Sequence, residues 1–155
     1  MIKLVVFDID GVITDGKILI NSQGEEFKQI DIKDVDAIYD FKRNGFIIAA
    51  ITGEATPITE YFRKRFPWDY FLTGNKKKAE AVKEIARDAG VTLEEICYIG
   101  DAKYDIDALK VVELPVCPSD ATDEVKQLSK VILTKRGGNG CILELLIMLK
   151  KVNQD

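Results

Sequence analysis

The chain has 155 residues, 46% of them apolar and 31% charged, and a net charge of −4 at neutral pH. This length suits one domain with a substantial core, so we expect residues 1–155 to form a single domain. The negative charge argues against a nucleic-acid partner, and no apolar run approaches the roughly 20 residues that a membrane span needs. Charged residues near the start do not fit a signal peptide, and a cytoplasmic protein is expected.

The sequence contains no histidine. This excludes Ser-His-Asp and Cys-His catalysis, phosphohistidine chemistry and most catalytic zinc sites. Cys97, Cys117 and Cys141 match no zinc or redox spacing and are expected to be buried free thiols. Acid–base catalysis must therefore come from carboxylates, lysine or tyrosine.

The stretch Lys3–Gly16, KLVVFDIDGVITDG, carries the clearest chemical signal. Leu4–Phe7 is short and rich in β-branched residues, which predicts a buried strand that ends at Asp8. Asp8 and Asp10 can face one crevice, beside a tight turn at Gly11. Two carboxylates this close repel each other unless a cation joins them or one holds a proton. The pair therefore indicates a Mg²⁺ site, a nucleophile with a general acid, or both, and the alternative is a simple turn cap.

Two short extended runs, 17–20 and 26–32, follow this stretch and are separated by Asn-Ser-Gln-Gly. This pattern predicts a protruding β-hairpin over about residues 17–32, beside the acidic stretch. A two-stranded ribbon is only marginally stable by itself, so we expect the hairpin to associate with another copy of the chain.

Helices and strands alternate in the rest of the chain. Asp34 is expected to cap a helix that runs to about Asn44, and a helix that begins near Pro57 is expected to bury Ile58, Tyr61 and Phe62. Further strands are predicted over 46–51, 68–72, 96–99, 114–117 and 131–133, and helices over 77–89, 106–111, 122–128 and 141–151. A glycine-rich loop over 136–140 is expected to be mobile. This order predicts a three-layer α/β fold with a central parallel sheet.

Polar residues follow several of these strands. Thr52 and Gly53 end the second strand, and Asp101 ends the strand over 96–99. Lys78 lies in the first turn of a helix, where a cation is unfavourable unless a bound anion offsets the helix dipole. Because the carboxyl ends of parallel strands meet at one edge of a sheet, these residues are expected to converge. The full predicted set is Asp8, Asp10, Thr52, Gly53, Lys78, Asp101 and Asp105.

The strings DIDGVITDG, ITG and YIGD with a second Asp four residues on resemble, in this order, the haloacid dehalogenase superfamily of phosphatases. The resemblance covers nearly the whole chain. It implies that Asp8 attacks phosphorus and becomes an aspartyl phosphate, while Asp10 protonates the leaving alcohol and later activates water. It also implies that Thr52, Gly53 and Lys78 hold the transferring phosphate oxygens.

The same resemblance implies a Mg²⁺ cofactor. Asp8, the backbone carbonyl of Asp10, and Asp101 would hold the ion, and Asp105 would orient its surroundings. Ala102 departs from the family pattern, in which an acid commonly follows the metal-binding aspartate, and Asn139 stands where Arg or Glu is frequent.

No large insertion follows Asp10 or Thr52, which resembles the subfamily without cap domains. That subfamily includes phosphatases of 3-deoxy-octulosonate 8-phosphate and of nonulosonate 9-phosphate, which are tetramers. The resemblance thus implies a phosphorylated 2-keto-3-deoxy sugar acid as substrate and a homotetramer built through the hairpin. Glu54 resembles the nonulosonate branch and favours the nine-carbon substrate over octulosonate 8-phosphate. Glu54, Arg65 and Arg136 are further candidates for substrate contact.

Two other interpretations stay open. One is a non-catalytic domain of the same fold, of the kind attached to sugar-activating cytidylyltransferases as an oligomerising module. The other is a phospho-receiver domain, which also gathers acids, Thr and Lys around Mg²⁺. In a receiver, however, the phosphorylated Asp follows a middle strand, where this chain has Thr52.

Overall fold

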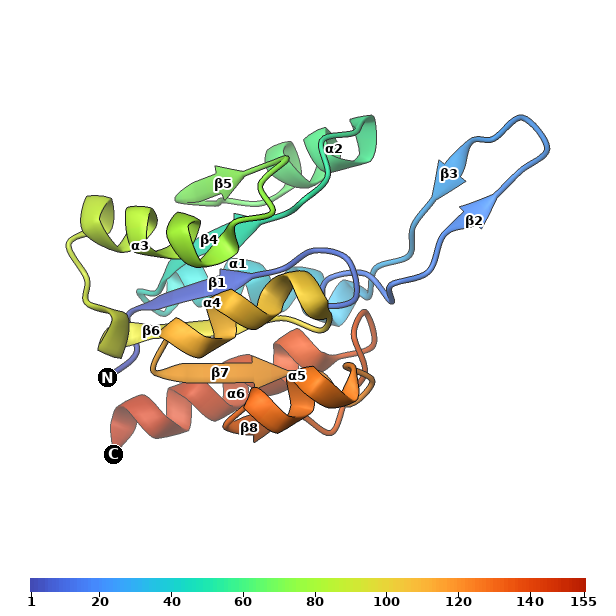
Figure 1. Cartoon of the computed structure of the whole chain (residues 1–155). Coiled ribbons are helices and arrows are strands. Elements are labelled where there is room, and N and C mark those ends of the chain that lie inside the picture. Colours follow the sequence, from blue (N-terminus) through green and yellow to red (C-terminus); the bar gives the residue numbers. More distant parts are fainter.

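A six-stranded parallel sheet forms the centre of the computed structural model, which describes residues 1–155 (Figure 1). Its strand order is β5-β4-β1-β6-β7-β8, so β1 lies in the middle, between β4 and β6. This is the predicted α/β sheet. The strands are β1 (Leu4–Phe7), β4 (Ile47–Ile51), β5 (Tyr70–Leu72), β6 (Ile96–Ile99), β7 (Leu114–Cys117) and β8 (Val131–Ile132).

Helices cover both faces of the sheet, which makes the three layers that the sequence predicts. Val5 and Phe7 of β1 pack into the core beneath α1, α2 and α6, whereas Leu4 and Val6 pack on the other face beneath α3, α4 and α5. No helix combines the length and the apolar character that crossing a bilayer requires. The helices are α1 (Ile32–Arg43), α2 (Pro57–Arg65), α3 (Lys78–Ala89), α4 (Ile106–Val111), α5 (Asp123–Leu128) and α6 (Cys141–Gln154), with short 3₁₀ turns at Leu93–Glu95 and Lys103–Asp105.

The predicted hairpin is present and stands away from the sheet (Figure 1). Its paired strands, β2 (Leu19–Ile20) and β3 (Glu26–Phe27), are shorter than the predicted runs, and Ile32, the last residue of the second run, belongs to α1. A bridge between Thr14 and Ile30 closes its base. The hairpin is the only element outside the three layers, and there is no cap domain, as predicted.

The prediction that Asp34 caps its own helix was wrong. The N-cap of α1 is Asp31, whose carboxylate accepts a hydrogen bond from the backbone N–H of Lys33. Asp34 is buried, and its two oxygens accept hydrogen bonds from the backbone N–H groups of Gly140 (3.0 Å) and Leu143 (3.1 Å). It therefore caps the first turn of α6, which lies more than a hundred residues further along the chain.

The prediction for the buried face of the helix that begins near Pro57 was only partly right. Phe62 is buried, as predicted, but Tyr61 is about half exposed because the inner face of α2 passes through Thr59 and Phe62. All three cysteines are buried free thiols, as predicted.

The loop over 136–140, which was expected to be mobile, is held against the segment that follows β1. The N–H of Gly138 donates to the carbonyl oxygen of Val12 (2.9 Å), and the N–H of Gly137 donates to the Asp120 carboxylate (3.0 Å). A Cβ added at Gly137 would lie 1.8 Å from the carbonyl oxygen of Gly11, so only glycine permits this approach. The glycines of this loop thus serve close packing.

Candidate active site

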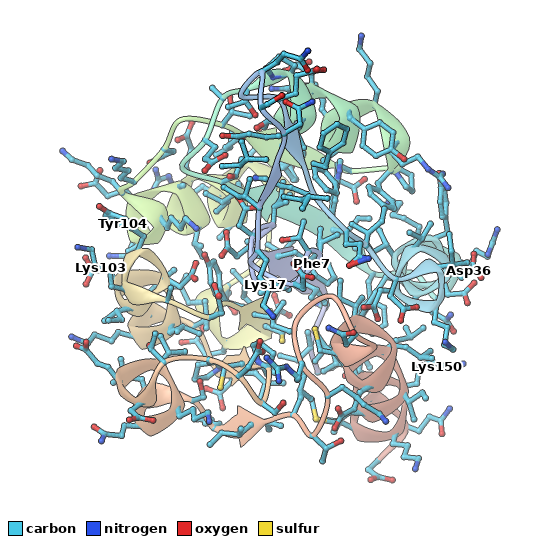
Figure 2. All side chains as sticks on the ribbon, turned by 90° about the vertical axis from the view of Figure 1, so that its right-hand side faces the viewer. Phe7, Lys17, Asp36, Lys103, Tyr104 and Lys150 are labelled. Atoms are coloured by element: carbon cyan, nitrogen blue, oxygen red, sulfur yellow. The ribbon has the colours of Figure 1, made fainter.

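The segments that follow β1, β4 and β6 meet at the carboxyl edge of the sheet, around a cavity of about 450 Å³. Figure 2 looks onto this edge, with Phe7, the last residue of β1, near the centre and Lys103 and Tyr104 to one side. The parallel sheet thus brings the predicted set together, because equivalent strand ends share one rim. The predicted residues that line the cavity are Asp8, Asp10, Thr52, Gly53, Glu54, Lys78, Asp101 and Asp105.

Lys78, the first residue of α3, lies at the floor of this cavity with its side chain only 4% exposed. Its Nζ is 2.9 Å from an oxygen of Asp8 and 2.9 Å from an oxygen of Asp105. Burial opposes the charged form, but the two carboxylates outweigh it and raise the pKa of Lys78 above its ordinary value. Lys78 therefore stays charged, and the anionic partners explain why a cation is tolerated at a helix N-terminus.

The site holds more negative charge than Lys78 balances. Burial, followed by repulsion from Asp105, raises the pKa of Asp8 well above its usual range, and the same two causes raise the pKa of Asp101 to about 6. Oxygens of Asp8, Asp101 and Asp105 lie within 4.8 Å of one another. A Cβ at Gly11 would lie 1.8 Å from Asp101 Oδ2, so this glycine lets the carboxylate reach the cluster. The carboxylate oxygens and the uncompensated negative charge of the site fit a divalent cation.

Asp105 uses both of its oxygens within the protein. Oδ2 accepts hydrogen bonds from the backbone N–H groups of Asp101 (3.0 Å) and Ala102 (3.2 Å). Oδ1 accepts from Lys78 and from the hydroxyl of Tyr98 (2.6 Å), which is fully buried in β6. Asp105 therefore orders the loop after β6 and the lysine. Tyr98 was not predicted, although a tyrosine within an otherwise apolar strand is a usable signal for a buried polar partner.

Asp10 differs from the three clustered carboxylates. Its side chain is about a third exposed, and its Oδ1 accepts a 2.7 Å hydrogen bond from Nζ of Lys28. The same Nζ lies 3.3 Å from Oε2 of Glu54, so one ammonium joins two carboxylates of the cavity wall. Lys28 directly follows β3 of the hairpin and was not predicted, because nothing in its local sequence distinguishes it from an exposed hairpin lysine.

Thr52 is buried directly after β4, beside Gly53. Its Oγ1 accepts a hydrogen bond from the N–H of Glu54 (3.2 Å) and donates to no protein group, so its proton is free for another acceptor. Lys76 also lines this wall, and its Nζ lies 5.3 Å from the centre of the Tyr104 ring. This wall therefore offers a hydroxyl, backbone N–H groups and a second ammonium.

Arg65 and Arg136 do not line this cavity in the single chain. Arg65 ends α2 and donates a 2.7 Å hydrogen bond to the hydroxyl of Tyr39. Arg136 lines a separate polar cavity of about 480 Å³, together with Lys17, and its Nε lies 3.7 Å from the Asp120 carboxylate. Substrate contact by either arginine stays a prediction.

Comparison with known proteins shows similarity over nearly the whole chain. A family model described as haloacid dehalogenase-like hydrolase matches residues 68–145. The 3-deoxy-D-manno-octulosonate 8-phosphate phosphatase of Haemophilus influenzae is 30% identical over 148 residues, which cover 96% of this chain and 82% of that protein. The enzyme of the same name from Yersinia pestis is 29% identical over 150 residues, with 96% and 80% covered.

Solved structures of similar proteins share the fold of this chain. The 3-deoxy-D-manno-octulosonate 8-phosphate phosphatase of Moraxella catarrhalis, in complex with a magnesium ion, a phosphate ion and KDO, matches with a TM-score of 0.91 and 29% identity, over 97% of this chain and 86% of that one. The cobalt-bound phosphatase of Haemophilus influenzae also matches with a TM-score of 0.91 and 29% identity, over 97% and 88%.

A parallel sheet whose carboxyl edge gathers buried aspartates, a threonine and a charged lysine is typical of an enzyme that acts on an anionic group. The chain belongs to the haloacid dehalogenase-like hydrolase family and is a phosphatase. Because the chain is a phosphatase, it is neither a non-catalytic module nor a phospho-receiver domain.

Proposed function

We propose that this phosphatase hydrolyses the phosphomonoester of a 2-keto-3-deoxy sugar acid through an aspartyl-phosphate intermediate. The observation that carries the proposal is the position of Asp8, which lies buried at the end of the central strand and is held by Lys78 at 2.9 Å. Because similar proteins are phosphatases of 3-deoxy-D-manno-octulosonate 8-phosphate, that eight-carbon compound is the first candidate substrate.

In the first step a carboxylate oxygen of Asp8 attacks phosphorus and the bond from phosphorus to the sugar oxygen breaks. The leaving oxygen takes its electron pair and receives a proton from Asp10. In the second step Asp10 takes a proton from water, which attacks the aspartyl phosphate and releases inorganic phosphate. Lys78 and the Thr52 hydroxyl stabilise the charge on the equatorial oxygens throughout.

Asp8, Asp101 and the backbone carbonyl of Asp10 are the groups that would hold Mg²⁺ in this site. The ion supplies the positive charge that lets an anionic carboxylate approach an anionic phosphate. The clustered oxygens of Asp8 and Asp101 and the raised pKa values of both side chains support this assignment. Removal of divalent ions with EDTA should abolish turnover, and added Mg²⁺ should restore it.

The nine-carbon nonulosonate 9-phosphate is the second candidate substrate. It is favoured by Glu54, whose carboxylate lines the cavity beside Gly53. In the free protein Glu54 forms an ion pair with Lys28. Glu54 would therefore have to contact the sugar while it is also paired with Lys28. Lys76 forms no ion pair, and we propose that it receives the substrate carboxylate.

We further propose that the chain assembles as a homotetramer through its hairpin. Ile18, Leu19, Ile20 and Phe27 are between 47% and 71% exposed on this ribbon, an apolar surface that a second copy would cover. Arg65 and Arg136 lie outside the cavity of their own chain, and contact with substrate would require a neighbouring subunit.

The test is phosphate release with Mg²⁺ from octulosonate 8-phosphate, nonulosonate 9-phosphates and simple hexose phosphates. We expect turnover of one acidic sugar phosphate that disappears in Asp8→Asn. Equal turnover of the hexose phosphates, which lack a carboxylate, would refute the substrate class, and turnover that survives Asp8→Asn would refute the mechanism.

A further inference from the structure

We infer that Lys28 is a positioning residue for Asp10: its ammonium holds one carboxylate oxygen so that the other faces the leaving oxygen of the substrate. This inference rests on the proposed function, because the proton transfer by Asp10 does. It gives the hairpin a role in the reaction, in addition to the role in assembly proposed for its apolar surface.

The burial of Lys28 is unusual for its place in the chain. It follows β3, where the neighbouring Phe27 is about half exposed, yet the Lys28 side chain is only 6% exposed. Instead of extending into water, it turns toward the cavity, 2.7 Å from Asp10 and 3.3 Å from Glu54. Ordering a long lysine side chain costs conformational entropy, and two charge-assisted contacts offset that cost.

The contacts of Asp10 are divided unevenly between its two oxygens. Oδ1 accepts from Lys28 and lies 3.5 Å from the Thr14 hydroxyl, whereas Oδ2 has no partner in the protein. The Thr14 hydroxyl is itself held by the N–H groups of Gly11 and Gly16, each at 3.2 Å. Without Lys28 only the long contact from Thr14 would remain, and the carboxylate would be free to rotate.

A proton transfer requires a short, directed contact between the two heavy atoms. Fixing Oδ1 leaves Oδ2 as the oxygen that gives a proton to the sugar oxygen. The Thr14–Ile30 bridge ties the base of the hairpin to the segment that carries Asp10, so the two side chains keep their relative position.

Substrates with different leaving groups distinguish a positioning role of Lys28 from a purely structural one. A sugar alkoxide needs a proton as it departs, whereas p-nitrophenolate is weakly basic and needs none. We would compare Lys28→Met, Lys28→Arg and the control Lys33→Met, which removes an exposed lysine in the first turn of α1. The readout is kcat/KM, which reports the steps up to the first irreversible one, for the sugar-acid phosphate and for p-nitrophenyl phosphate.

For Lys28→Met we expect kcat/KM to fall roughly 10- to 100-fold with the sugar phosphate and by less than about threefold with p-nitrophenyl phosphate. Lys28→Arg should recover most of the loss because it keeps a cation on Oδ1. Lys33→Met should match the wild type on both substrates.

An equal loss on both substrates, or no loss on either, would overturn the inference, and so would an arginine variant as impaired as Lys28→Met. If Lys28→Met does not fold, Lys28→Gln takes its place under the same criteria. Wild-type protein that hydrolyses no phosphomonoester would refute the proposed function and this inference together. Wild-type activity with equal losses in the variant refutes only the positioning role.

Discussion

Replacement of Lys78 by methionine tests how the buried charges of the site balance. Lys78 and Asp105 have side chains only 4% and 2% exposed, so solvent screens their interaction little. Loss of one partner of a buried ion pair costs about 3–5 kcal/mol, because the remaining charge is left without compensation. We therefore expect the free energy of unfolding at pH 7 to fall by about that amount and the melting temperature by about 6–20 °C.

The loss of unfolding free energy in Lys78→Met should depend on pH in a defined direction. Burial and the negative charge of Asp105 raise the pKa of Asp8 above its unfolded value, so the folded state is penalised above that folded pKa and relieved as the pH falls and the carboxyl takes up a proton. Lys78 has a raised folded pKa, so its contribution is fully present below the ordinary lysine pKa and is lost only in strong alkali. The same causes raise the pKa of Asp101 to about 6, so Asp101 takes up a proton between pH 7 and pH 5. The difference in the free energy of unfolding between wild type and Lys78→Met should therefore narrow over this interval.

The measurement is urea unfolding of both proteins at the two pH values, in EDTA so that no divalent ion replaces the lost charge. Lys77→Met is the matched control, since Lys77 is exposed, forms no ion pair and directly precedes α3. It should change stability by less than about 0.5 kcal/mol. A loss below about 1 kcal/mol for Lys78→Met, or a difference that widens at pH 5, would refute the reasoning.

Three more predictions concern other parts of the molecule. Asp34→Ala should lower the free energy of unfolding by about 2–4 kcal/mol in urea titration, because two N–H groups of α6 lose their acceptor, and Asp34→Asn should lose less. Gly11→Ala should lower phosphatase turnover and Mg²⁺ affinity at least about tenfold, because its Cβ would occupy the place of the Asp101 carboxylate. Leu19→Asp combined with Phe27→Asp should shift the sedimentation coefficient toward that of a monomer.

The Gly11→Ala prediction has a matched control within the chain. Gly45 has the same positive φ of 85° as Gly11 but open space around it, so Gly45→Ala should cost stability and leave turnover unchanged. Equal turnover losses in the two variants would mean that backbone strain, not the clash, is responsible. An unchanged unfolding energy for Asp34→Ala, or an unchanged assembly for the double aspartate variant, would contradict the other two predictions.

Local sequence was sufficient for the framework of the site. Leu4–Phe7 is four consecutive apolar residues and became the fully buried central strand, because a strand covered on both faces needs no polar alternation. The Asp8 position followed from the end of that strand. Convergence with Thr52 and Asp101 followed from parallel pairing alone, since parallel strands place all their carboxyl ends on one rim.

Contacts between distant segments were decided only by the tertiary structure. The local spacing around Asp34 resembles an N-cap, but the nearer Asp31 takes that place and the buried Asp34 carboxylate serves α6. Lys28 looks like any hairpin lysine until the fold turns it onto Asp10.

The fold class and most of the residues at the carboxyl edge could thus be predicted from the sequence, because strand and helix periodicity and strand ends are local properties. The tertiary structure decided which charges meet: Lys78 with Asp8 and Asp105, and Lys28 with Asp10. Partners of buried charges are set by distances across space, and their spacing along the chain carries no record of those distances.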